Sequence, residues 1–178
     1  MIGTSFSVFF FGVSPQDNVV RYNGIKFVNS ENPNEGKLWI AKINGADAAF
    51  SFLPAEVEDV LALDDFPKAL KDRLEIDVAY DLNNTYKESI ALAQHQMDLT
   101  LAEYNIYLRK GFTTNNTFNL PVITCNDATL SVPVVYFKYG NLTSIHVSDN
   151  CVIAEASSNS DFIKVKDRLL YGILGVIK

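Results

Sequence analysis

The sequence predicts a mixed α/β domain of the α+β type, in which an N-terminal antiparallel β-meander precedes a mixed sheet with flanking helices. Three observations predict it. The 178 residues fit one domain, and 48% hydrophobic residues supply enough apolar surface for a core. Strand patterns joined by turn residues fill the first third, and strand and helix periodicities then alternate. We expect one globular domain over residues 21–178, with the meander and short helices in 21–73.

The first 20 residues form a separate apolar segment. Ile2 to Val13 is rich in phenylalanine and contains no charged side chain. It is shorter than the about 20 apolar residues that cross a bilayer, and it lacks the basic start and cleavage site of a secretory signal. Two interpretations stay open, because the alternation over residues 4–8 is typical of a strand, whereas the run could also be the remnant of a longer membrane anchor.

Turn residues divide the meander. Asn44-Gly45 predicts a type I′ hairpin turn, and a second turn is expected over residues 32–36. Trp39 is expected in the core. The predicted strands cover residues 21–28, 38–43 and 46–53.

Two short helices are expected next, at Pro54 to Leu63 and Pro67 to Arg73, because proline suits the first helical turn. From Leu74 to Tyr80 apolar and polar residues alternate, which predicts a strand with one buried face. The clearest helix follows the capping residues 83–85 and ends at Gly111. Its apolar stripe is Ile90, Ala93, Met97, Leu101, Tyr104 and Leu108.

The remaining strands are expected at Leu120 to Cys125 and Val132 to Tyr139, with Ser144 to Ala156 as the hairpin partner of the latter. Ser160 is the expected cap of a closing helix. The run Leu169 to Ile177 is apolar almost all round, which favours packing over the sheet; a contact patch for a partner or a membrane is the alternative.

The order of elements from Leu74 onward, with the segment Val132-Pro133-Val134-Val135-Tyr136-Phe137-Lys138-Tyr139-Gly140, resembles the thioredoxin-like fold. The resemblance covers about residues 74–178 and implies a cis peptide bond at Pro133. The Cys-x-x-Cys of redox-active members would fall at Asp81 to Tyr86, where this chain has no cysteine. The resemblance therefore implies kinship with redox-inactive members that serve as binding or assembly modules.

The chain contains two cysteines, Cys125 and Cys151, which lie 26 residues apart on elements expected to be neighbours. We expect a structural disulfide, and such bonds persist in oxidising compartments. Two buried free thiols in a cytoplasmic protein are the alternative. Three Asn-x-Thr acceptors for N-glycosylation, at Asn83, Asn115 and Asn141, agree with an extracytoplasmic location.

Residues able to perform acid-base chemistry are few and scattered. His95 and His146 belong to no shared motif, and we expect neither to bind a metal. Glu75, Asp77 and Asp81 would project from one side of a strand, where a solvated face is the expected role. No phosphate-binding loop or hydrolase motif occurs, so we expect no catalytic residue, metal or cofactor.

The net charge of −6, with no local cluster of Lys and Arg along the sequence, disfavours nucleic acid as a partner. The hypothesis we favour is a non-enzymatic, extracytoplasmic interaction or assembly domain, either secreted or tethered to a membrane through its N-terminus. Its protein partner and oligomeric state are unknown. A thiol-disulfide oxidoreductase or redox sensor that uses Cys125 and Cys151 is the alternative.

Overall fold

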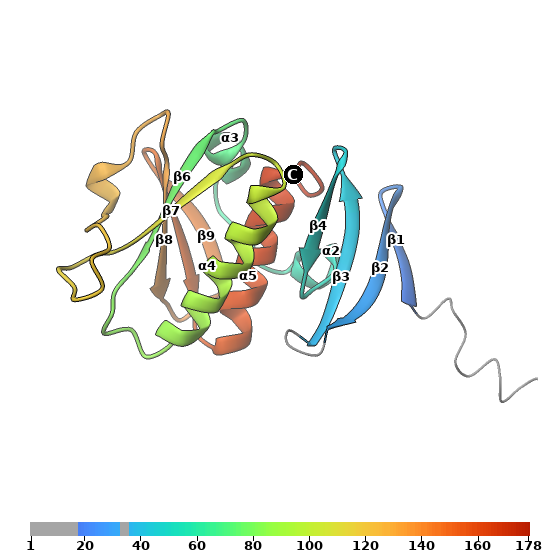
Figure 1. Ribbon diagram of the computed structural model, residues 1–178, viewed down its shortest axis with the longest axis horizontal. Coiled ribbons are helices and arrows are strands. Elements are labelled where there is room, and N and C mark those ends of the chain that lie inside the picture. The colour runs from blue at the N-terminus through green and yellow to red at the C-terminus, as the bar shows by residue number, and fades with distance from the viewer. Residues whose placement is uncertain (1–17, 33–35) are drawn as a thin grey trace, which may run out of the picture.

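A computed structural model describes residues 18–32 and 36–178 of the chain. The described part has three layers: a four-stranded sheet, a layer of helices and a six-stranded sheet (Figure 1). Together these elements confirm the predicted mixed α/β class. The segment Ile2 to Val13 lies outside the described residues, so both interpretations of it stay predictions.

The four-stranded sheet is the predicted antiparallel meander. Its strands lie in the order β1-β2-β3-β4. They are β1 (Val19–Tyr22), β2 (Ile25–Asn32), β3 (Gly36–Ile43) and β4 (Ala46–Phe50). The Asn44-Gly45 turn is confirmed, with φ of 50° and 91°. A single strand over residues 21–28 is wrong, because Asn23 and Gly24, at φ of 46° and 81°, make a second turn of the same kind.

The inner face of this sheet packs on the C-terminal helix α5 (Asn159–Ile173). The ring of Tyr171 stacks on Phe50 with centroids 4.1 Å apart, and Phe27 meets Tyr171 edge-on at 6.1 Å. The Tyr171 hydroxyl donates a 2.7 Å hydrogen bond to the carbonyl of Phe52. Trp39 is buried in the same core, as predicted.

The segment that joins the two sheets is less helical than predicted. It contains α2 (Pro54–Val57), the two-residue strand β5 (Leu61–Ala62) and α3 (Phe66–Leu70). The helix from Pro54 stops early because the amides of Leu61 and Leu63 donate to the carbonyls of Thr143 and Ile145. These bonds draw the chain into the edge of the second sheet.

The six-stranded sheet has the order β5-β9-β10-β8-β6-β7. Its longer strands are β6 (Glu75–Tyr80), β7 (Tyr107–Phe112), β8 (Val134–Tyr139), β9 (Ser144–Ser148) and β10 (Cys151–Ala156). Strand β8 pairs in parallel with both β6 and β10, and only β9 and β10 form a hairpin. The predicted hairpin between β8 and the next strand is therefore wrong. Apolar residues on both faces of β8 suit its central position.

Helices α4 (Lys87–Ala102) and α5 lie between the two sheets (Figure 1). The predicted helix to residue 108 is too long, because Asn105 adopts φ 57° and reverses the chain. Leu108 and Gly111 belong instead to β7, and Leu108 reaches the same core from the sheet. The expected cap at Ser160 is also wrong: Ser158 caps α5 and accepts from the amide of Asp161.

The burial of α5 explains its composition. Residues 169–174 and Val176 are all buried, since the helix has a sheet on either side. Only the C-terminal run of α5 is apolar all round, as is typical of such a position, whereas Lys166 and Asp167 earlier in the helix are buried as an ion pair. The predicted packing of the terminal run is confirmed.

Strand β6 is buried on both faces, so the prediction of one buried face is wrong. Residues 113–133, which we call the capping loop, cover its outer face. The predicted strand Leu120 to Cys125 is absent: Val122 forms a single bridge to Phe112, and Cys125–Asp127 form the 3-10 helix η2. Gly111 permits this approach, because a Cβ there would lie 2.6 Å from the carbonyl oxygen of Pro121.

Candidate functional site

The two cysteines are joined by a disulfide, as predicted. Cys125 begins η2, Cys151 begins β10, and their Cα atoms are 5.2 Å apart. The bond therefore ties the capping loop to the sheet, where the sequence predicted a link between two strands.

A small apolar cluster surrounds this bond. Ala79, Ile123, Val134 and Cys151 are buried together, with Cys125, Ala128, Tyr136 and Ile153 packed beside them. The loop thus has its own core on the outer face of the six-stranded sheet. Burial of this kind, added to the covalent link, fixes the loop against the sheet.

An ion pair lies at the edge of the covered area. Arg109 on β7 donates from Nε and Nη2 to the two carboxylate oxygens of Asp77 on β6, at 2.7 and 2.5 Å, and its Nε lies 3.4 Å from Glu75. The Asp77 side chain is 1% exposed and that of Arg109 is 44% exposed. The hydrogen bond to Asp77 raises the pKa of Arg109. The predicted solvated face is therefore wrong for Asp77, which is buried and paired.

The rest of the outer face is open and forms a groove of about 840 Å³. Strands β8, β9 and β10 make its floor, and β5 and the turn after β8 make its walls. We call it the outer groove. Its lining residues are Leu61, Leu63, Asp64, Lys138, Tyr139, Gly140, Asn141, Leu142, Ser144, His146 and Glu155.

The floor of the outer groove is polar and ordered by contacts. Lys138 Nζ lies 2.9 Å from a Glu155 carboxylate oxygen, linking β8 to β10. Gly140 leaves room for Glu155, because a Cβ at that position would lie 2.8 Å from its carboxylate. The Asp64 carboxylate accepts a 2.9 Å hydrogen bond from the amide of Val147. This backbone donor at the exposed edge of β9 is therefore paired.

The walls carry exposed apolar side chains beside the polar Asp64 and Asn141. Tyr139, Leu63 and Leu142 are 52%, 61% and 65% exposed. Tyr139, the last residue of β8, borders the groove at the edge of the sheet, where its ring stacks on Tyr86 just before α4 with centroids 6.0 Å apart. The site therefore combines ordered polar groups with exposed apolar side chains, a composition common in interaction surfaces.

Two smaller hollows adjoin the outer groove along the carboxyl ends of the parallel strands. One shares Lys138 and Tyr139 with it and is lined also by Asp81, Asn83, Asn84, Thr85 and Tyr136. The other shares Tyr136 with the first hollow, shares no lining residue with the outer groove, and reaches Thr113, Thr124, Cys125 and Asn126. Ligands of α/β sheets commonly bind at this edge.

The structure separates most residues singled out in the sequence. His95 is exposed on α4, whereas His146 lines the outer groove from β9. Asp81 lines the adjoining hollow, and Asp77 is covered. Within residues 18–32 and 36–178, no group of three His, Cys, Asp or Glu side chains could hold a metal ion.

Pro133 is not preceded by a cis peptide bond, since the described residues contain none. The expectation of a cis bond there is wrong. The backbone of Pro133 takes part in the sheet, because its carbonyl accepts a 3.0 Å hydrogen bond from the amide of Asp77. The three glycosylation acceptors Asn83, Asn115 and Asn141 are exposed outside helices and strands, and their modification stays a prediction.

Sequence reasoning missed Tyr136, Lys138, Tyr139 and Glu155. Alternation along β8 and β10 places Tyr136, Lys138 and Glu155 on the outer face, but only the pairing of these strands brings Lys138 to Glu155. Among the described residues, no helix is both long enough and apolar enough to span a membrane.

Comparisons with protein families, curated proteins and solved structures find no match to this chain. The resemblance to the thioredoxin-like fold therefore stays a prediction.

Proposed function

We propose that this chain is a non-enzymatic interaction domain that works outside the cytoplasm and binds a protein partner through the outer groove. The observation that carries the proposal is the combination of an ordered polar floor and exposed apolar walls on one open sheet face. The inner face of that sheet is filled by helices, and the capping loop covers part of its outer face. The groove is the part of the face left for a partner.

The shape of the groove favours a polypeptide over a small molecule. Small-molecule sites are concave and bury most of the ligand surface, whereas this groove is open along the sheet and continues into one neighbouring hollow, beside which lies the second. A peptide segment can lie along such a surface. Its apolar side chains would contact Leu63, Tyr139 and Leu142, and its polar backbone would contact Lys138 and Glu155.

The polar groups of the groove are arranged for binding. Lys138 and Glu155 form an ion pair, and the Asp64 carboxylate accepts a hydrogen bond from the backbone amide of Val147. Charged groups that are already paired fix the register and charge preference of a partner.

The disulfide and the three exposed Asn-x-Thr acceptors support the extracytoplasmic part of the proposal. Disulfides persist in oxidising compartments, so a surface loop that is ordered by a disulfide keeps its structure there. The alternative location is the cytoplasm, where the same cysteines would be reduced.

A thiol-disulfide enzyme is the second candidate, and one observation favours it. Cys125 is partly exposed and lines a hollow beside Tyr136, whereas Cys151 is buried. An incoming thiolate could attack Cys125 Sγ, form a mixed disulfide there and release Cys151 as a thiolate. Insulin reduction that requires Cys125 would establish this function, and a bond that resists mild reductant would exclude it.

The interaction function is tested by photo-crosslinking in the cells that produce the protein. A benzoylphenylalanine replaces Tyr139 in the groove, and a control places it at exposed Lys71, immediately after α3. We expect a discrete adduct from position 139 that Leu142→Glu abolishes, and no such adduct from position 71. Equal labelling from both positions, or an adduct that survives Leu142→Glu, would contradict the proposal.

A further inference from the structure

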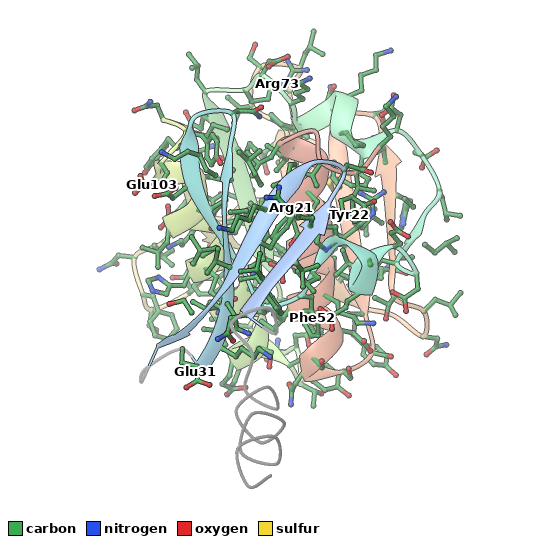
Figure 2. The ribbon with its side chains drawn as sticks, turned by 90° about the vertical axis from the view of Figure 1, so that its right-hand side faces the viewer. Arg21, Tyr22, Glu31, Phe52, Arg73 and Glu103 are labelled. Carbon is green, nitrogen blue, oxygen red and sulfur yellow. A yellow bond between two sulfur atoms is a disulfide. The ribbon has the colours of Figure 1, made fainter. Side chains whose placement is uncertain are left out.

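The outer face of the four-stranded sheet carries two rows of residues, one apolar and one basic. Figure 2 looks onto this sheet and labels Arg21 on β1. The rows follow from the strand register, because residues of equal parity along a strand share a face. The inner face belongs to Phe27, Ala41 and Ala48, so their neighbours in each strand point outward.

The apolar row crosses all four strands. Val19 pairs with Val28, Val28 with Ile40, and Ile40 with Ala49. Val28 is 39% exposed and the other three are partly exposed. A continuous apolar row on an outer sheet face indicates a contact surface.

The basic row lies two residues further along the strands. Arg21 pairs directly with Lys26, and the pairing of Phe27 with Ala41 sets Lys26 beside Lys42. Lys42 in turn faces Asp47 on β4. Three cations therefore lie on three adjacent strands, about 5 Å from one strand to the next.

Asp47 offsets the charge at one end of this row, but Arg21 lies opposite Lys26, and Lys26 lies beside Lys42, with no anion between them. Like charges directly opposite each other destabilise a sheet. All three side chains are exposed, and among the described residues none of them forms a salt bridge. The whole chain has a charge of −6, so cations concentrated on one face orient that face toward negative charge.

We infer that this basic face, formed by Val19, Arg21, Lys26, Val28, Ile40 and Lys42, lies on an anionic phospholipid surface. Basic side chains would contact lipid headgroups, and the adjacent apolar row would enter the interface. In the sequence, the apolar run Ile2 to Val13 ends five residues before β1 begins. Nucleic acid would use the basic row but leave the apolar row without a role.

The inference is independent of the partner in the outer groove. The basic face and the six-stranded sheet lie on opposite sides of the helix layer (Figure 1). A molecule seated on lipid through the basic face would hold the outer groove away from the bilayer, where a protein could reach it.

The test is sedimentation of the full chain with vesicles of phosphatidylcholine alone or mixed with phosphatidylserine. The variant is Arg21→Gln/Lys26→Gln/Lys42→Gln. The control is Lys68→Gln/Lys71→Gln/Lys87→Gln, which removes the same charge from exposed positions at α3 and α4. Circular dichroism confirms that both variants are folded.

We expect binding only to vesicles that contain phosphatidylserine. Each cation near such a surface contributes about 1 kcal/mol, so the basic-face variant should bind on the order of 100-fold more weakly while the control stays within about threefold of wild type. Equal binding to both kinds of vesicle would assign attachment to the apolar run and overturn the inference. No vesicle binding, with binding to polyglutamate that the variant loses, would assign the face to an acidic protein and overturn it as well.

Discussion

Asp77 and Arg109 sit directly opposite each other on β6 and β7 and form a two-point ion pair whose carboxylate is almost completely buried. The pair lies where the capping loop meets the edge of the sheet. Removal of one partner leaves a buried charge without compensation, which is the costly way to break such a pair.

Arg109→Met should lower the free energy of unfolding by about 3 kcal/mol, the low end of the usual range because Arg109 is partly exposed. Urea unfolding measures the change. The matched control is Lys110→Met, which breaks the more exposed pair with Asp98 and should cost less than about 1 kcal/mol. Equal effects of the two variants would show that the burial of Asp77 does not matter.

The disulfide should contribute substantially to stability, because it closes a segment of 26 residues. In the chain-entropy account, Cys125→Ala/Cys151→Ala should cost about 3 to 4 kcal/mol in urea unfolding. Reductant should reproduce this loss in the wild-type protein and leave the variant unchanged. A variant as stable as the oxidised protein would mean that the capping loop is held by packing alone.

Tyr104 anchors the hairpin between β3 and β4 to the end of α4. Its hydroxyl oxygen lies 2.9 Å from the carbonyl of Ile43 and 3.2 Å from that of Ala46, so its one proton is shared between the two acceptors. Burial, with smaller effects from Asp47 and Glu103, raises the pKa of Tyr104 to about 12 from 10. The folded state therefore holds the phenol proton more tightly than the unfolded state, and stability present below pH 10 should be lost as the pH rises to 12.

Tyr104→Phe should reduce this alkaline loss, and it should remove one late-titrating phenol from the absorbance change at high pH. Urea unfolding between neutral pH and pH 12 checks the first effect, with Tyr107→Phe as the control at an exposed tyrosine. An unchanged slope of stability with pH in Tyr104→Phe would contradict the assigned role.

Gly172 lets α5 approach α3. A Cβ at this position would lie 2.5 Å from the Phe66 ring, so Gly172→Ala should destabilise the fold by about 1 to 3 kcal/mol through overpacking. The double variant Gly172→Ala/Phe66→Leu should recover part of that loss. Absence of any recovery in thermal unfolding would show that the crowding comes from elsewhere.

Local patterns predicted much of this fold. Asn44-Gly45 marks its hairpin because only residues tolerant of positive φ suit a type I′ turn. The same signal at Asn23-Gly24 was available and shows that the first strand is really two. The composition of α5 predicted its burial, and the two cysteines predicted the disulfide.

Other features depend on pairing between distant segments. Leu108 belongs to β7, although it continues the apolar spacing of α4. The spacing is misleading because the helix and the strand both direct side chains into the same core. Arg21, Lys26 and Lys42 are dispersed in sequence and become neighbours only through strand register. The outer groove likewise exists because β8 pairs with β10 rather than β9.

The most direct test of the account compares the photo-crosslinked adduct from position 139 in the wild type and in Cys125→Ala/Cys151→Ala, at a temperature where circular dichroism shows both to be folded. A binding domain stapled by a structural disulfide should give the same adduct in similar yield from both proteins. Loss of the adduct from the folded cysteine-free protein would contradict the account, because the cysteines would then take part in the activity itself.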